Sequence, residues 1–453
     1  MGSIKISRRQ AIKASSAIFL PGLISDRSLA ISGNAISGNA ISGNAISGNA
    51  ISGNERDYPP ARTITHGPGH HWFGYYDKLE FDQSNRFVLS NEVGFEHRTP
   101  KATDAIQVGM VDTGDNDRWI HLGESRAWGW QQGCMLQWRP NSKSEVVWND
   151  RDGDQHVCRV MDVTTRKVRT LPRPIYSLSQ DGRWAITTDF SRIQRMRAGY
   201  GYVGLTDPTA RERAPENSGV WRMNMDTGES KLVFSLADAA RIEHQGNGLA
   251  KHWNYFNHLL VSPDSSRFIV LHRWKKDNGD AKNPQPTGGF TTRMFTVAMD
   301  GSARCNLDPS GNTSHFIWKD SESICAWTRP KNKSAGFYLM RDQTEDISLI
   351  GEGVMTHNGH NTYVPNTEQS WILNDTYPSR GKREQVPYLF HVPSGRRVDL
   401  GAFHSPEEYR GEWRCDTHPR CSNDGKTVAI DSPHAGGGRQ IHLIDISKII
   451  AEQ

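Results

Sequence analysis

The stretch KHWNYFNHLLVSPDSSRFIVLHRW, Lys251–Trp274, decides the fold. An apolar strand begins just after His258, the residues SPDSSR form a turn, and a second strand rich in β-branched and aromatic residues follows. The turn residue Pro263 lies five positions after His258. The stretch therefore predicts one strand–turn–strand unit with a histidine at its entrance.

This unit recurs along the chain at intervals of about fifty residues. Later copies carry a histidine at the same distance ahead of a turn residue, at His315, His360 and His418. Earlier copies lack that histidine and begin at Tyr75, Cys134 and Ile175. Seven such units predict an all-β protein, a seven-bladed β-propeller.

The shared register of His258, His315, His360 and His418 has a geometric consequence. The first strand of each propeller blade lines the central channel, so equal register aims four imidazoles at one place on the axis. The alternative is that each histidine is a separate core or turn residue. The last unit supplies only about three strands, and Ala61–Thr65 is predicted to close the ring as its fourth, because closure removes the sheet edges.

Composition narrows the class of partner. The chain has 453 residues, enough for one large all-β domain or for two or three ordinary ones, and a net charge of +4. Its acidic and basic residues are interspersed, which argues against a nucleic-acid-binding stripe. No window has the roughly eighteen apolar residues of a membrane span, so we expect no integral membrane segment in the mature chain. The oligomeric state is left open.

The sequence before the propeller contains two segments of distinct composition. Ser7–Lys13, SRRQAIK, resembles a twin-arginine export signal, and a modest apolar run and the small-residue site Ser28–Ala30 follow it. Five ISGN repeats come next. We therefore predict a signal segment at 1–30, a flexible low-complexity linker at 31–57 and a propeller domain at 58–448, in a periplasmic or secreted protein.

Two ring-rich stretches are candidate saccharide-binding segments. The loop HGPGHHWFGYYDK carries His71 and Tyr76, and the stretch SRAWGWQQGCMLQW carries Trp128 and Gln132. Indole rings next to amide side chains suit the stacking and hydrogen bonding of a sugar. The alternatives are a capping loop packed on the first blade and buried structural tryptophans.

The third unit is interrupted after WAITTDF by a long insertion containing RMRAGYGY, with Arg197 and Tyr202. Long insertions inside a repeat are common functional positions. Arginine binds a carboxylate in a bidentate manner, and a cation next to a tyrosine lowers its pKa towards proton transfer. The alternative is a solvated basic loop. Helical patterns occur at Ser235–His244 and in the last few residues.

The order NHLLVSPD, SHFIWKD, GHNTYVPN, THPRCSNDG resembles the oligogalacturonate lyases, over roughly residues 65–446. These are seven-bladed propellers with a histidine-rich divalent-metal site in the channel. The segment RMRAGYGY is more similar to the seven-bladed ulvan lyases, which use Tyr, His and Arg side chains on a sulfated uronic polysaccharide. The resemblance implies an exported lyase that cleaves a pectic or sulfated uronic-acid polysaccharide or oligosaccharide by β-elimination.

The resemblance also implies roles for particular residues. A divalent metal ion is expected at the four registered histidines, with manganese or zinc favoured over calcium because the ligands are imidazoles. The first family mixes histidine with an amide ligand, so one of the four histidines can be a base or an outer residue instead. Arg197 is expected to hold the uronate carboxylate, and Tyr202 or His252 to move the proton.

Two other classes of function stay open. A hydrolase or sulfatase-like enzyme lacks support, because neither paired carboxylates nor a nucleophile motif stands out. A non-catalytic propeller would bind a glycan or a protein through its Trp- and Tyr-rich face. Histidines scattered over outer strands would favour this binding module.

Overall fold

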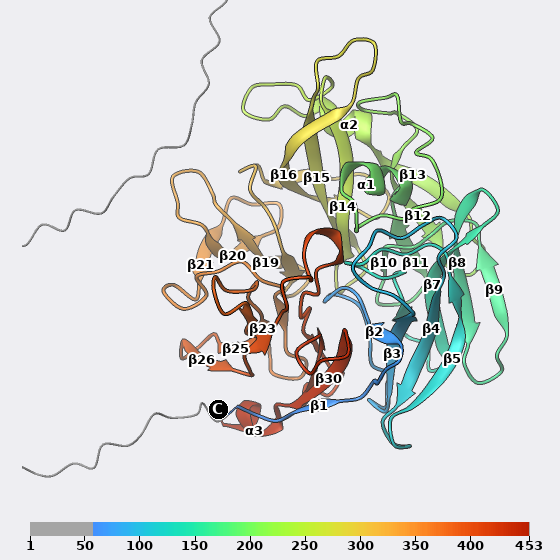
Figure 1. Ribbon diagram of the computed structural model, residues 1–453. Helices are drawn as coiled ribbons and strands as arrows, with labels where there is room; N and C mark the ends of the chain where they lie inside the picture. Colours follow the sequence, from blue (N-terminus) through green and yellow to red (C-terminus); the bar gives the residue numbers. More distant parts are fainter. Residues whose placement is uncertain (1–57, 453) are drawn as a thin grey trace, which may run out of the picture. The chain divides into compact units, whose positions relative to one another are not determined.

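The computed structural model describes residues 58–452, and over these residues seven four-stranded antiparallel sheets follow one another around a common centre (Figure 1). The first three are β2 (His70–Trp72), β3 (Phe87–Val93), β4 (Ile106–Asp112), β5 (Arg118–Ser125); β6 (Gln137–Trp138), β7 (Glu145–Asp152), β8 (Gln155–Asp162), β9 (Val168–Leu171); and β10 (Ser177–Leu178), β11 (Trp184–Thr187), β12 (Gly219–Asn224), β13 (Ser230–Ser235). The seven-bladed propeller predicted from the recurring unit is confirmed.

The next three blades repeat this order, with one extra strand pair outside the ring. They are β14 (Trp253–Val261), β15 (Arg267–Asp277), β16 (Pro286–Ala298), β17 (Cys305–Asp308); β18 (Phe316–Trp318), β19 (Ser323–Thr328), β20 (Gly336–Arg341), β21 (Ile347–Ile350); and β22 (Thr362–Tyr363), β23 (Trp371–Asn374), β25 (Tyr388–His391), β26 (Arg396–Asp399). The extra pair is β24 (Glu384–Gln385) with β27 (Phe403–His404).

The last blade joins the two ends of the described chain. It consists of β28 (Arg420–Cys421), β29 (Thr427–Ser432), β30 (Gln440–Asp445) and β1 (Ala61–Thr63). Ala61 pairs with Ile444 and Thr63 with His442. The predicted closure is confirmed, and it removes the free edge of β30.

Short helices lie between or after the strands: α1 (Phe190–Met196), α2 (Leu236–Arg241), the 3₁₀ turn η1 (Gly411–Trp413) and α3 (Ser447–Ala451). The helical patterns expected for α2 and α3 are confirmed, but α1 lies in the insertion that the sequence reads as loop. The Asp189 carboxylate caps α1 by accepting from the backbone of Ser191 and Arg192. Phe190, Ile193 and Met196 bury one face, so packing stabilises a helix too short to be evident from its pattern.

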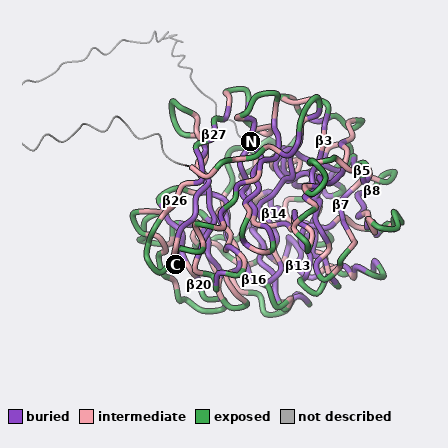
Figure 2. The backbone as a smooth tube through the Cα atoms, turned by 90° about the horizontal axis from the view of Figure 1, so that it is seen from below, coloured by how far each residue is buried: buried purple, intermediate pink, exposed green. Residues whose placement is uncertain are grey.

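The core lies within and between the blades, while exposed residues gather in the connecting loops (Figure 2). The alternation of each strand places side chains such as Leu259, Phe268 and Val270 against neighbouring blades. No helix of the described residues is long and apolar enough to cross a membrane. The predicted export signal at 1–30 and linker at 31–57 lie outside the described residues.

Candidate metal centre and acid-binding site

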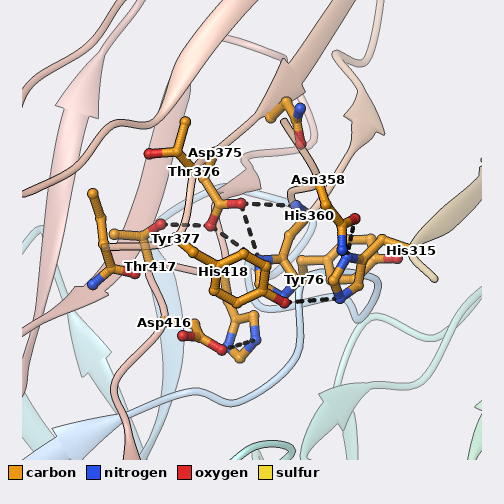
Figure 3. A network of polar contacts seen from close by, with 12 residues as sticks. Tyr76, His315, Asn358, His360, Asp375, Thr376, Tyr377, Asp416, Thr417 and His418 are labelled. Atoms are coloured by element: carbon orange, nitrogen blue, oxygen red, sulfur yellow. Dashed lines mark hydrogen bonds and ion pairs between the residues drawn. The ribbon is translucent and has the colours of Figure 1, made fainter. Parts of the chain in front are cut away.

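Three of the four registered histidines meet at the centre of the propeller. His315, His360 and His418 stand at or just before the first strands of the fifth, sixth and seventh blades. The ring centroids of His315 and His360 are 4.2 Å apart, and those of His360 and His418 are 4.3 Å apart (Figure 3). Equal register along the sequence therefore places these imidazoles side by side.

The fourth registered histidine, His258, contacts Phe316 and Asp77, and no ring contact joins it to the other three among the described residues. Its ring stacks on Phe316 at 4.0 Å, and its Nε2 is 3.4 Å from Asp77 Oδ2. Tyr75 and Tyr76 contact both His258 and the other histidines, with Tyr75 4.9 Å from His258 and Tyr76 5.3 Å from His360 between ring centroids. Their loop, which follows β2, thus fills the channel instead of only capping the first blade.

Two of the histidines adopt left-handed backbone conformations. His258 has φ +53° and sits where the pairing of β14 with β15 shifts register, and His418 has φ +38°. This region of φ is uncommon for residues other than glycine and costs about 1–3 kcal/mol. Such strain is concentrated at functional sites, which supports a role for this group beyond packing.

A buried carboxylate fixes the orientation of His360. Asp375 accepts hydrogen bonds from the backbone N of His360 at 2.7 Å, from its Nδ1 at 3.0 Å and from the Thr417 hydroxyl at 2.6 Å (Figure 3). Because Nδ1 donates to Asp375, Nε2 of His360 keeps its lone pair free. This is the usual support of a metal-ligating histidine.

Asp416 joins His360 and His418 to form a group of potential metal ligands. The ligand atoms of these three residues all lie within 4.8 Å of one another. His360 Nε2, His418 Nε2 and Asp416 Oδ1 are buried and have no hydrogen-bond partner among the described residues. Nitrogen and carboxylate donors left unpaired in this way fit a divalent transition metal.

His315 and His258 flank this group. His315 Nδ1 is 2.9 Å from Asn358 Oδ1, and its Nε2 is 3.4 Å from the Tyr377 hydroxyl. Burial lowers the pKa of His315 and of His418 well below the ordinary value. Electrostatic repulsion from the neighbouring His360 lowers both further. Burial likewise lowers the pKa of His258 to about 4, although Asp77 opposes that shift. These three imidazoles are therefore neutral near pH 7, the state that binds metal.

A tyrosine flanked by two arginines lies beside the His/Asp group. Arg197 donates to the Tyr200 hydroxyl at 2.9 Å and Arg414 donates to it at 2.6 Å. Arg414 also donates to Asp416 Oδ2 at 2.8 Å. Burial opposes ionisation of Tyr200, but the charges of Arg197 and Arg414 outweigh it, and the pKa of Tyr200 is lowered.

A third arginine of this region, Arg273, forms no ion pair with a carboxylate among residues 58–452. Arg273 is 5% exposed, and its Nε and Nη1 have no hydrogen-bond partner among the described residues. Burial lowers its pKa, and repulsion from Arg197 adds to this effect. Both guanidiniums lie near the half-exposed ring of Phe290, at 4.7 and 5.1 Å from its centroid. A buried cation without a partner is costly, so this region is suited to receive an anion.

The structure does not place Tyr202 or His252, the two residues predicted to move the proton, next to His360, His418 and Asp416. Tyr202 is fully buried, its ring stacks on Phe190 at 4.2 Å, and its hydroxyl accepts from Asn149 at 2.9 Å. Burial raises the pKa of Tyr202 well above its ordinary value. Burial lowers the pKa of His252, and its charged neighbour is Lys276. Tyr200 was missed because the sequence does not tell which tyrosine of GYGY faces the arginines.

The predicted sugar-binding residues are buried. Trp128 is 1% exposed and donates to the carbonyl of Asp104, so it is a structural tryptophan instead of a platform. His71 packs edge-on against Trp119 within the first blade. Gln132 donates to Tyr176 at 2.8 Å, and the Tyr176 hydroxyl accepts from the backbone N of His258. Gln132 is therefore a buried residue that holds Tyr176, and through it His258, in position.

Tyr76 is the one predicted sugar-binding residue that contacts the histidine group, although it too is buried. Its hydroxyl donates to the carbonyl of Phe316 at 2.8 Å. The residues that sequence reasoning missed are Asp77, Tyr200, Arg273, Asp375, Arg414 and Asp416. For Asp416, the only sequence signal is its position two residues before His418, because the backbone there is not an extended strand and His418 has a left-handed φ.

Comparison with solved structures places this architecture among known propellers. An oligogalacturonate lyase in complex with manganese is similar over 88% of this chain and 96% of its own, with a TM-score of 0.60 and 12% identity. The oligogalacturonate lyase of Vibrio parahaemolyticus gives a TM-score of 0.59 at 12% identity, over 86% of this chain and 95% of its own. At this identity the likeness shows the β-propeller fold. No family model matches the chain, and no curated protein matches it by sequence.

Proposed function

We propose that this protein is a metal-dependent lyase that cleaves a uronic-acid saccharide by β-elimination. The observation that carries the proposal is one chain of contacts, Arg197–Tyr200–Arg414–Asp416, which joins an arginine-rich anion site to the His/Asp group. The fold shared with a lyase that was solved with manganese supports the same choice of metal.

The reaction needs three things from the site. The C5 proton of a uronate is weakly acidic, so the negative charge that develops on the neighbouring carboxylate must be stabilised. A base must take that proton, and the oxygen that leaves C4 must receive one. When bound by His360, His418 and Asp416, a divalent cation would supply positive charge next to the substrate carboxylate.

The side chains present are suited to the remaining roles. Arg273 and Arg197 would hold the carboxylate, because one of them is a buried cation without a counter-ion. The Tyr200 oxygen, whose pKa is lowered by Arg197 and Arg414, would accept the C5 proton. The C5–H electron pair then forms the C4–C5 double bond, the C4–O bond breaks, and Tyr200 returns the proton to the departing oxygen.

The test is a direct assay for elimination. Elimination leaves a 4,5-unsaturated uronate that absorbs ultraviolet light, whereas hydrolysis leaves none. Purified protein is incubated with polygalacturonate, ulvan and a glycosaminoglycan, with and without a chelator. We expect absorbance to rise on one of them, to stop with the chelator and to return with manganese or zinc.

Two variants test which residues bind the metal and which transfer the proton. His418→Ala should lose both metal and activity, while Tyr200→Phe should lose activity and keep the metal. Activity that survives chelation and His418→Ala would exclude a metal-dependent reaction. No absorbance on any uronic polymer would instead favour a propeller that binds glycans without cleaving them.

A further inference from the structure

A cavity of about 670 Å³ lies between the second and third blades. Its walls come from the start of β8, the β9–β10 connection, the start of α1 and the strands β12 and β13. None of the axial histidines and arginines lines it. Its volume is that of a small-molecule site.

The cavity contains an arginine without an ion pair. Arg173, held between two prolines, lies over the ring of Trp221 at 3.6 Å from its centroid, and its Nε donates to Ser230 Oγ at 2.8 Å. Among residues 58–452, no carboxylate lies within ion-pair distance of its guanidinium. Burial lowers the pKa of Arg173, and the charge of Asp189, which does not contact the guanidinium, opposes that shift only in part.

The carboxylates that line the cavity are occupied or solvated. Asp189 Oδ1 accepts from the backbone N and hydroxyl of Ser191 and from the backbone N of Arg192, which is the cap of α1. Asp154 is exposed to water. Neither therefore neutralises Arg173 by contact, and its two Nη atoms, which donate to no residue among 58–452, are left for an incoming anion.

The rest of the wall is polar. His156 is 9% exposed and lines the cavity, and its Nε2 has no hydrogen-bond partner among the described residues. Hydroxyl side chains supply most of the other polar groups, from Thr188, Ser191, Thr206, Thr209 and Ser218. A wall of hydroxyls with one imidazole and one guanidinium complements a ligand that has several hydroxyls and a single acidic group.

We infer that this cavity is a second saccharide-binding site, which takes an acidic sugar residue with its carboxylate or sulfate on Arg173. The helix α1 begins at the cavity and ends next to Arg197, and its seven residues span about 10 Å. The cavity and Arg197 therefore lie at opposite ends of α1. This inference goes beyond the proposed function, because binding here does not require the elimination reaction.

The test counts bound monosaccharides, which cannot be cleaved. Equilibrium dialysis with labelled galacturonate should find two molecules per wild-type chain, one on the axis and one in the cavity. Arg173→Gln should bind one, with the affinity of the cavity weakened about tenfold or more. Asn217→Trp fills the cavity from an exposed position and should do the same. The control Arg118→Gln, on the solvent side of β5, should still bind two.

The outcomes separate this inference from the proposed function. If only the axial site fails, wild type binds one galacturonate and Arg173→Gln binds none. Equal binding by wild type, Arg173→Gln and Asn217→Trp, all with unchanged melting temperatures, would overturn the inference. If neutral galactose binds in the cavity as tightly as galacturonate, the claim that the ligand is acidic is wrong. If Arg173→Gln does not fold, Asn217→Trp decides.

Discussion

Replacing Asp375 by asparagine tests the metal centre without removing a ligand. Asp375 accepts from the backbone N of His360 and from the Thr417 hydroxyl, and His360 Nδ1 lies 3.0 Å from both of its oxygens. An asparagine oxygen can keep the two bonds from His360, and its amide can donate to the Thr417 oxygen. The fold should therefore persist. The negative charge next to Nδ1, which strengthens Nε2 of His360 as a metal ligand, is lost. Loss of such an outer partner weakens metal binding about 10–100-fold.

The measurement is a calorimetric titration of chelator-stripped protein with Mn²⁺ or Zn²⁺. Asp308 is a matched control, because it is buried and also accepts from a hydroxyl, at Thr313, and from a backbone amide, at Ser310. Asp308→Asn should change the melting temperature but leave the metal affinity within about twofold of wild type. Wild-type affinity in Asp375→Asn, or equal weakening in Asp308→Asn, would refute the assignment of His360 as a ligand. A wild-type protein that binds neither metal would refute the metal centre itself.

The remaining predictions concern the tyrosine, the unpaired arginine and acid stability. Tyr200→Phe should lower kcat about 100-fold or more with little change in KM, whereas Tyr202→Phe should stay within about threefold, as ultraviolet initial rates will show. Arg273→Met should lower kcat/KM at least about tenfold while the melting temperature stays equal or rises, because a buried unpaired charge is removed; a large fall in melting temperature would contradict this. Burial lowers the pKa of His71 and His442 from 6.5 to about 4. Between these values the unfolded chain binds more protons, so stability should be full above pH 6.5 and fall towards pH 4, by about 3 kcal/mol per histidine; urea titrations across this range that show no change would contradict it.

The histidine register shows how far local sequence carries the site. A blade is one strand–turn–strand unit, so a fixed distance from histidine to turn places His315, His360 and His418 at the same end of their inner strands. Of the four rings predicted to meet, His315 contacts His360 and His360 contacts His418, whereas the ring of His258 stacks on Phe316. His258 keeps the register only through a bulge with φ +53°, and the loop with Tyr75 fills the space beside it. The position of that loop depends on packing and could not be read from spacing.

The tyrosine of the insertion shows where sequence reasoning ends. Tyr200 and Tyr202 lie in the same segment, and both are buried. Their difference comes from partners far along the chain: Tyr200 accepts from Arg414, which is 214 residues away, while Tyr202 accepts from Asn149 in the second blade. Only the fold brings these partners to them.

The sequence by itself determined the blades, their number, the closing strand and the alignment of the axial histidines. Alternation, turn chemistry and spacing are local properties, and they are the same in every repeat. The tertiary structure decided that Asp416 joins His360 and His418 and that Arg414 links this group to Tyr200. Closure of the ring brings segments from different blades together at one axis, and no local pattern encodes which side chains then come into contact.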